Sequence, residues 1–219
     1  MLDLGCGVGD QAAELAARGA QVIGVDVNAE LLAAAAARAI GGAHFVHDDI
    51  CALPDLGMRA DGVWSSFAAA YLPEPVETLR TWAAQLAPGG WIALTEIDDL
   101  FGHEPLGARH RTILDEFARE ALAAKRYDFC MGRKLDAYLR EAGFVVRQTL
   151  YVDDDELSFQ GPAQREVLEA WQARLDRMKG LQDFAGGGFE RLRDELLACM
   201  ASPEHRSTAK VVCCIATRG

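Results

Sequence analysis

Apolar and polar positions alternate in blocks along the chain, and these blocks predict strands and helices in turn. Short apolar runs bounded by Gly, Pro and Asp predict strands at 1–4, 20–26, 43–47, 60–66, 91–97, 144–152 and 209–217. Apolar residues at helical spacing predict helices at 10–18, 29–40, 75–86, 105–125, 161–179 and 189–201. Strands that alternate with helices favour an α/β fold, with a parallel sheet covered on both faces.

The first predicted strand runs directly into a glycine-rich turn. Gly5, Gly7 and Gly9 stand at alternate positions before the helix that begins at Asp10. Glycine lets a backbone turn sharply and approach a ligand, and the first amides of a helix favour anionic groups. The second strand ends at Asp26, about 20 residues past this turn, where an α/β nucleotide site holds a ribose hydroxyl. This pattern predicts a nucleotide cofactor site.

The glycine spacing separates two classes of cofactor. The dinucleotide pattern G-x-G-x-x-G needs a glycine at position 10, where this chain has Asp10. Residues 3–9, Asp-Leu-Gly-Cys-Gly-Val-Gly, instead resemble motif I of the class I S-adenosylmethionine (SAM) dependent methyltransferases. The resemblance implies a doubly wound, Rossmann-like sheet of seven mostly parallel strands with an antiparallel last strand. It also implies SAM as the cofactor.

Further segments resemble the same family. Residues 48–54 are similar to its G-D-x-x-x-L-P motif, 61–75 to the segment after its fourth strand, and 88–91 to its P-G-G-x turn. Ser65 lies where that fourth strand ends. The resemblance implies that the motif I residues hold the methionine end of SAM, Asp26 the ribose, and Asp49 and Ile50 the adenine, on which Val27 packs. The implied cofactor-binding residues are Asp3, Gly5, Cys6, Gly7, Gly9, Asp26, Val27, Asp49, Ile50 and Ser65.

The resemblance predicts one domain, with a core of 1–98, 132–152 and 209–217. The segments 99–131 and 153–208 are additions that we expect to form a helical cap and to select the acceptor. Family members usually carry lid helices ahead of the first strand, whereas this sequence begins two residues before motif I. A misassigned start, a truncation or covering by other segments would each account for this.

Methyl transfer from a sulfonium requires an aligned acceptor more than a base, because SAM already carries its leaving group. Where the acceptor loses a proton, the candidates for the base are His103, Tyr71, Glu96 and Asp98. Tyr71 stands where relatives line the methyl-transfer pocket, and we place His103 on a polar loop, 98–105, after the fifth strand. Asp98, Asp99, His103 and Glu104 do not complete a metal pattern, so no metal is predicted.

Composition narrows the partners. The chain of 219 residues has a net charge of −11, which argues against binding nucleic acid. Its six cysteines show no C-x-x-C pair, and no apolar run is long enough to span a membrane. We expect a cytoplasmic monomer or homodimer that methylates an O or N atom of a small molecule. The alternatives are a protein or RNA methyltransferase and a catalytically silent, SAM-binding partner subunit.

Overall fold

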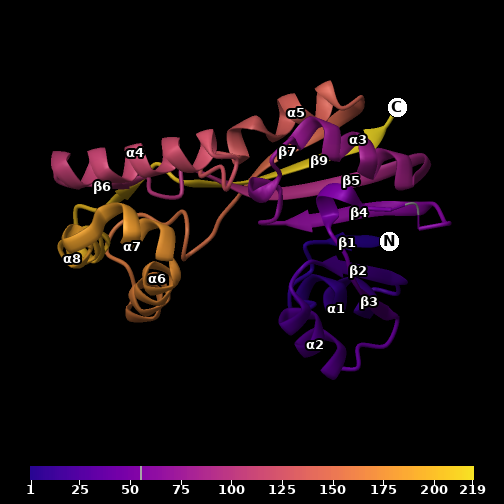
Figure 1. Ribbon diagram of the computed structural model, residues 1–219, viewed down its shortest axis with the longest axis horizontal. Helices are drawn as coiled ribbons and strands as arrows, with labels where there is room; N and C mark the ends of the chain where they lie inside the picture. The colour runs from indigo at the N-terminus through magenta and orange to yellow at the C-terminus, as the bar shows by residue number, and fades with distance from the viewer. Residues whose placement is uncertain (55) are drawn as a thin grey trace. The chain divides into compact units, whose positions relative to one another are not determined.

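The computed structural model describes residues 1–54 and 56–219, and the chain forms two compact units (Figure 1). Unit 1 comprises Met1–Glu96, Arg133–Leu150 and Val212–Gly219. Unit 2 comprises Ile97–Gly132 and Tyr151–Val211.

A seven-stranded sheet organises unit 1, in the order β3-β2-β1-β4-β5-β9-β7. The strands are β1 (Leu2–Leu4), β2 (Val22–Asp26), β3 (Ala43–His47), β4 (Ala60–Ser66), β5 (Leu86–Asp98), β7 (Phe144–Val152) and β9 (Lys210–Arg218). The pairs from β3 across to β5 are parallel. Arg147 bonds Thr217 while Thr149 bonds Cys214, so β7 and β9 run antiparallel. The predicted sheet is confirmed.

The helices that flank this sheet begin and end where local signals place them. They are α1 (Asp10–Ala17), α2 (Ala29–Ala37), α3 (Pro75–Gln85) and α5 (Leu135–Glu141), with short 3₁₀ turns η1 (Ile50–Ala52), η2 (Ala69–Tyr71) and η3 (Gly132–Lys134). The side chain of Asn28 accepts the amides of Glu30 and Leu31 and so caps α2. Pro75 opens α3, where its missing N–H costs nothing.

The predicted turn at 87–90 lies inside strand β5. Ala60 pairs with Leu86 and Gly62 pairs with Trp91, so one residue of β4 faces a four-residue excursion of β5. The P-G-G turn and the strand therefore both exist. The strand begins at Leu86, before the turn, whereas the sequence predicts that it begins at Trp91, after the turn. A bulge of this kind bends the strand while its ladder resumes on the far side.

Unit 2 is mostly helical and has its own core. Its helices are α4 (Ala108–Ala123), α6 (Arg165–Arg177), α7 (Lys179–Ala185) and α8 (Phe189–Ala201), and the 3₁₀ turn η4 (Gly186–Gly188) precedes α8. Trp171, Leu175, Leu181 and Leu196 are among the fully buried residues of this core. The carboxylate of Glu195 on α8 accepts the amide of Gly107 at 2.9 Å, which ties α8 to the start of α4.

The segment predicted as a polar loop, 98–105, contains a strand instead. β6 (His103–Glu104) pairs antiparallel with β8 (Arg206–Ser207), a contact between residues far apart in the sequence. Two residues carry too little periodicity to reveal a strand, and the partner strand is equally short. The loop prediction was therefore wrong at His103 and Glu104.

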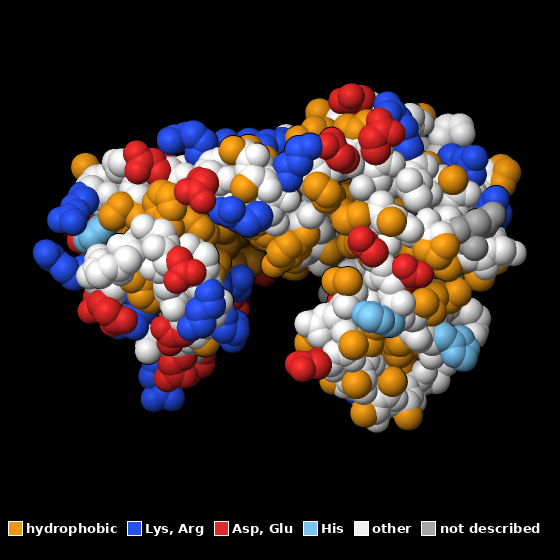
Figure 2. All heavy atoms as spheres, viewed as in Figure 1, with side chains coloured by type: hydrophobic (Ala, Val, Ile, Leu, Met, Phe, Trp, Pro, Cys, Tyr) orange, Lys and Arg blue, Asp and Glu red, His pale blue; other side chains and the backbone are white. Residues whose placement is uncertain are grey.

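The described surface of unit 2 carries side chains of both charges. On the face shown in Figure 2, basic and acidic side chains are interspersed over the helices of unit 2. Among the described residues, no helix is both long and apolar enough to cross a membrane.

Candidate cofactor site

The glycine turn after β1 is built by three residues in left-handed backbone conformations. Gly5, Gly7 and Gly9 have φ angles of 77°, 52° and 79°. The amides of Gly5 and Cys6 both donate to the carbonyl of Val25, at 2.8 and 3.1 Å, which fixes the turn against β2. Residues with a side chain rarely adopt such φ angles, so the backbone conformation by itself favours glycine at these three positions.

The three glycines differ in what surrounds them. A Cβ added to Gly5 would lie 2.4 Å from the Cβ of Ala68, and one added to Gly9 would lie 2.8 Å from the ring of Phe45. A Cβ added to Gly7 would meet nothing within 4 Å. Gly5 and Gly9 therefore allow close packing within the protein, whereas Gly7 leaves open space that a ligand can approach.

Asp26 lies at the end of β2 and is bonded to this turn. Its Oδ2 accepts the amide of Gly7 at 2.8 Å, and its Oδ1 accepts the amide of Asn28 at 2.8 Å. Each carboxylate oxygen has a second lone pair, so Asp26 keeps acceptor capacity for ligand hydroxyls. The two halves of the predicted site thus meet directly at Gly7.

Asp3 and Cys6 lie beneath the turn and are buried. Asp3 is 1% exposed, and burial raises its pKa to about 7, an effect that the amide of Ala12 opposes and nearby Asp26 reinforces. Burial also raises the pKa of the Cys6 thiol to about 12, so this thiol stays neutral. Neither side chain is exposed at the surface of the turn.

The residues predicted to contact adenine follow β2 and β3. Val27 is 68% exposed, which is unusual for an aliphatic residue beside a sheet and suits packing against a ring. Asp49 caps η1 by accepting the amide of Cys51 at 2.8 Å. The carbonyl of Ile50 accepts the indole N–H of Trp82 at 2.8 Å, which anchors η1 on α3.

The segment after β4 lies beside the glycine turn. Ser65 is 1% exposed and its hydroxyl donates to the carbonyl of Leu4 at 2.8 Å. This bond joins two strands within the sheet, and the contact of Ser65 with the cofactor stays a prediction. Tyr71 closes η2 with its side chain 60% exposed.

Phe67, after β4, and Glu96, on β5, carry features that the sequence does not reveal. Phe67 has a positive φ of 55° and is 41% exposed. A bulky residue in this conformation is strained, and such strain often marks a functional segment. Buried Glu96, at the end of β5, accepts the amide of Ala70 at 2.9 Å and fixes η2 in place. No glycine or turn motif signals either feature.

His103 belongs to the core of unit 2. It is fully buried, and its Nδ1 lies 3.0 Å from Nε2 of His205. The other nitrogen of His205 lies 2.9 Å from the carbonyl of Gly161, and it must donate there. Two neutral rings then satisfy both contacts only if Nδ1 of His103 donates to His205.

The surroundings of His103 oppose its protonation. Burial lowers its pKa to about 3, and the positive charge of Arg111 adds to this effect. Trp171 meets the ring edge-on, with centroids 4.9 Å apart. A buried, neutral imidazole held in this way favours a structural role over that of a general base.

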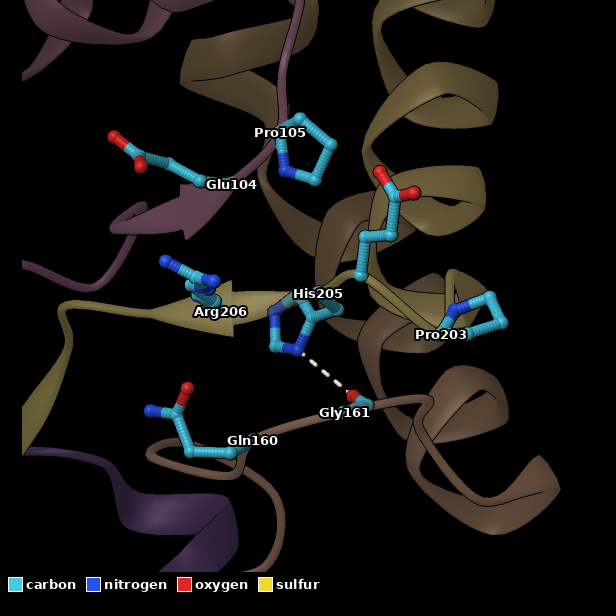
Figure 3. A pocket seen from close by; sticks show the side chains of 8 residues that line it. Glu104, Pro105, Gln160, Gly161, Pro203, His205 and Arg206 are labelled. Carbon is cyan, nitrogen blue, oxygen red and sulfur yellow. Dashed lines mark hydrogen bonds between the residues drawn. The ribbon is translucent and has the colours of Figure 1, made fainter.

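A pocket of about 760 Å³ opens beside this histidine pair (Figure 3). Gln160, His205 and Arg206 line it, and Figure 3 shows the ring of His205 bonded to Gly161. The amide group of Gln160 both donates to and accepts from the backbone of Ser207. The polar groups of Gln160 and His205 are thus already paired within the protein. No cluster of three or more metal-ligating side chains occurs in the described part of the chain.

Comparison with known proteins shows what this region resembles. Residues 1–90 match the family model described as a methyltransferase domain. Over these residues the chain is similar to methyltransferases. A trans-aconitate 2-methyltransferase of Deinococcus radiodurans is 36% identical over 96 residues, which cover 43% of this chain and 36% of the relative. The chain therefore spans about a third of the length of that methyltransferase.

Longer matches are weaker in identity. A ubiquinone biosynthesis O-methyltransferase of Nitrosospira multiformis is 27% identical over 157 residues, covering 68% of this chain and 64% of the relative. The phosphoethanolamine N-methyltransferase 2 of Haemonchus contortus, solved with SAM, superposes with a TM-score of 0.60 at 20% identity, over all of this chain and 48% of that one. The [4+2]-cyclase SpnF gives a TM-score of 0.63 at 21% identity, over 99% and 73%. These structures share the fold.

The residues of the glycine turn fit SAM, the ligand with which the Haemonchus contortus neighbour was solved. The open space over Gly7 admits a close ligand, and the carboxylate of Asp26 has acceptor capacity for ribose hydroxyls. The exposed side chain of Val27 offers an apolar surface for adenine. SAM bound at these residues would supply an activated methyl group on a sulfonium.

Proposed function

We propose that the protein transfers the methyl group of SAM to an O or N atom of a small molecule. The observation that carries the proposal is the contact between Gly7 and Asp26, because it joins the glycine turn and the ribose acid at an opening that no side chain fills. Residues 1–90, which the methyltransferase family model matches, contain every residue of this arrangement.

In this proposal the residues of unit 1 bind and orient. Gly5, Gly7 and Gly9 shape the turn that receives the methionine end, and Asp26 accepts the ribose hydroxyls. Asp49 accepts the adenine amine through its remaining lone pairs, and Ile50 contributes a backbone contact.

Tyr71 is the residue that we place on the acceptor side. Its exposed ring follows β4, where open α/β sheets bind their ligands, and its hydroxyl can position or deprotonate an acceptor. His103 is not assigned the role of base here, because its burial opposes protonation.

The relatives support a small acceptor without fixing its identity. Their names include a methyltransferase of a carboxylic acid, one of ubiquinone biosynthesis and one of an amine. The net charge of −11 disfavours a nucleic-acid substrate. We propose further that unit 2 contributes to acceptor choice, since it comprises most of the segments outside the family core.

One observation favours a second candidate, a SAM-binding protein that does not transfer methyl groups. The fold neighbour SpnF is a cyclase, so this fold supports chemistry other than methylation.

An assay with methyl-labelled SAM separates these possibilities. The chain is incubated with panels of phenols, carboxylic acids and amines, and in parallel with total RNA and with protein extract. Label in a small molecule, with equal formation of S-adenosylhomocysteine (SAH), is the expected result. Label in RNA or protein would contradict the proposed acceptor class, and tight SAM binding without transfer in any panel would favour the silent candidate.

A further inference from the structure

Asp3 is a buried acid with an incomplete set of partners. Its carboxyl group accepts the amide of Ala12 at the start of α1, and its Oδ2 has no hydrogen-bond partner. The side chain is 1% exposed, so bulk solvent does not reach this oxygen. A desolvated oxygen without a donor is costly when it bears negative charge and much less so when it carries a proton.

The neighbours of Asp3 add no positive charge. The titratable group of β2 that interacts with Asp3 is the carboxyl group of Asp26. The titratable group of the glycine turn is the neutral thiol of Cys6. The register partners of Asp3 in β2 and β4 are uncharged, namely Gly24 and Trp64. The acids of α1, Asp10 and Glu14, are exposed and paired with Arg38 and Arg18, each at 2.6 Å.

Of the two acids, Asp26 has the more complete set of hydrogen bonds. Both of its oxygens accept backbone amides, from Gly7 and Asn28. Donated hydrogen bonds favour the ionised form of a carboxyl group. Asp3 has one such bond and an unpartnered oxygen, so a proton between the two acids belongs on Asp3.

We propose that Asp3 carries a proton in the free protein and releases it to the solvent when the cationic methionine end of SAM binds. This inference rests on the proposed function, which places that end at the glycine turn. The O–H bond of the Asp3 carboxyl group breaks, the proton passes to a buffer base, and the ammonium of the ligand supplies the missing positive charge. Asp3 thereby links cofactor affinity to pH.

The direction of this linkage follows from the burial of Asp3, which raises its pKa to about 7 in the free protein. Below that pH, binding must displace a proton, so SAM affinity falls up to about tenfold for each unit of pH. Above pH 8 the acid is already ionised, and affinity no longer depends on it.

Titration calorimetry in phosphate and in imidazole buffer measures the number of protons released on binding. At pH 6 we expect the release of about one proton per SAM, and at pH 7.5 a release of only about a quarter of a proton, because most of Asp3 is then already ionised. SAH keeps the ammonium and is expected to release the same number. 5′-Methylthioadenosine lacks the amino-acid end and should bind without releasing a proton.

Two variants test the assignment. In Asp3→Asn the release at pH 6 is lost, whereas the exposed acid of the matched control, Asp10→Asn, leaves it unchanged. If Asp3→Asn does not fold, the carboxyl ¹³C shift of Asp3 in the native chain gives the same information, with an expected midpoint near 7 in the free protein and below 5 with SAH.

Three results would overturn the inference: SAM binding at pH 6 without proton release, release that persists in Asp3→Asn, or a midpoint near 4 in the free protein. Failure of both SAM and SAH to bind the native chain would instead contradict the proposed function itself, and the inference with it.

Discussion

Single residues of the site act through the space they leave and the atoms they bond. Gly7 can test the site because the strain of its positive φ and the open space around it can be measured separately. Its φ of 52° has a close counterpart in Gly186 of unit 2, at 54°, and neither position has another atom within 4 Å of an added Cβ. A side chain strains the backbone at both positions, and the ψ of −135° makes Gly186 a position that essentially only glycine adopts, but only Gly7 borders the proposed cofactor.

Replacing Gly7 with leucine should reduce SAM affinity by more than tenfold, because the side chain enters the space reserved for the ligand. Gly186→Leu is the matched control. Both variants should lose on the order of 1–3 kcal/mol of unfolding free energy, because both positions have a positive φ. Denaturant unfolding and SAM titration measure the two effects, and an equal loss of SAM affinity in both variants would contradict the assignment of Gly7.

Tyr71 is the residue that we propose to contact the methyl acceptor. Its ring is 60% exposed, so Tyr71→Phe removes a hydroxyl without leaving a cavity. We expect kcat to fall at least tenfold, a typical effect of losing acid–base or positioning contacts, with SAM affinity and Tm unchanged. Tyr151→Phe, at a residue that is 70% exposed on β7, is the control. An unchanged kcat in Tyr71→Phe would remove Tyr71 from the mechanism.

At the scale of elements, the site is held by contacts between the ends of neighbouring strands. Phe67 donates its amide to the carbonyl of Thr95 at 2.8 Å, and Ala70 donates to the carboxylate of Glu96 at 2.9 Å. The space occupied by Ala68 is the space that a side chain on Gly5 would need. The ends of β1, β4 and β5 are therefore fixed to one another before any ligand binds.

Glu96→Ala should weaken this arrangement. It removes an acceptor of the Ala70 amide and leaves space in a fully buried position, so unit 1 should lose about 2–4 kcal/mol of unfolding free energy. Glu96→Gln retains an acceptor oxygen and should lose less. Glu77→Ala, an exposed acid on α3, serves as the control. Chemical denaturation followed through buried Trp82 reports the result, and equal stability of Glu96→Ala and Glu77→Ala would refute the role of Glu96.

The sequence predicts helices and strands well where the apolar periodicity and the residues that end an element agree. The strands 43–47, 60–66 and 144–152 and the helix 189–201 occur with the predicted bounds. The glycine spacing and the acid at the end of β2 belong to one pattern, which predicts that both lie in one site but does not predict the bond between Gly7 and Asp26.

What the sequence does not predict depends on contacts between distant segments. β6 exists only because β8, about a hundred residues later, pairs with it, and burial of His103 follows from that pairing. Ser65 resembles a ligand contact by its position at the end of a strand, but its hydroxyl bonds Leu4 across the sheet. Neither pairing leaves a local signal in the sequence.

At the scale of the molecule, buried titratable groups make stability depend on pH. Burial lowers the pKa of both His103 and His205, so their folded forms bind protons less readily than the unfolded chain. Their contribution to stability is present above the unfolded value of about 6.5 and is lost as pH falls below it. Asp3 acts in the opposite sense, since its raised pKa makes the free protein less stable as pH rises from about 4 towards 7.

Denaturant unfolding between pH 7.5 and 5 measures the contribution of the two histidines to the free energy of unfolding. For His103 alone, unit 2 should lose about 2 kcal/mol over this range. His103→Gln should reduce the pH slope, whereas His44→Gln, at an exposed residue of β3, should retain it. The fluorescence of fully buried Trp171 follows unit 2. An identical slope in the native chain and in His103→Gln would contradict the neutral histidine pair.

The most direct test of the central claim is calorimetric titration of the chain with SAM, SAH and NAD, in the native form and in Asp26→Ala. The site predicts micromolar binding of SAM and SAH, no binding of NAD, and a loss of at least tenfold in the variant, because a charged acceptor of the ribose hydroxyls is removed. Glu30→Ala, an exposed acid on α2, should bind like the native chain. Equal binding by the native chain and Asp26→Ala, or binding of NAD in place of SAM, would show that the β1 turn and Asp26 do not form a SAM site.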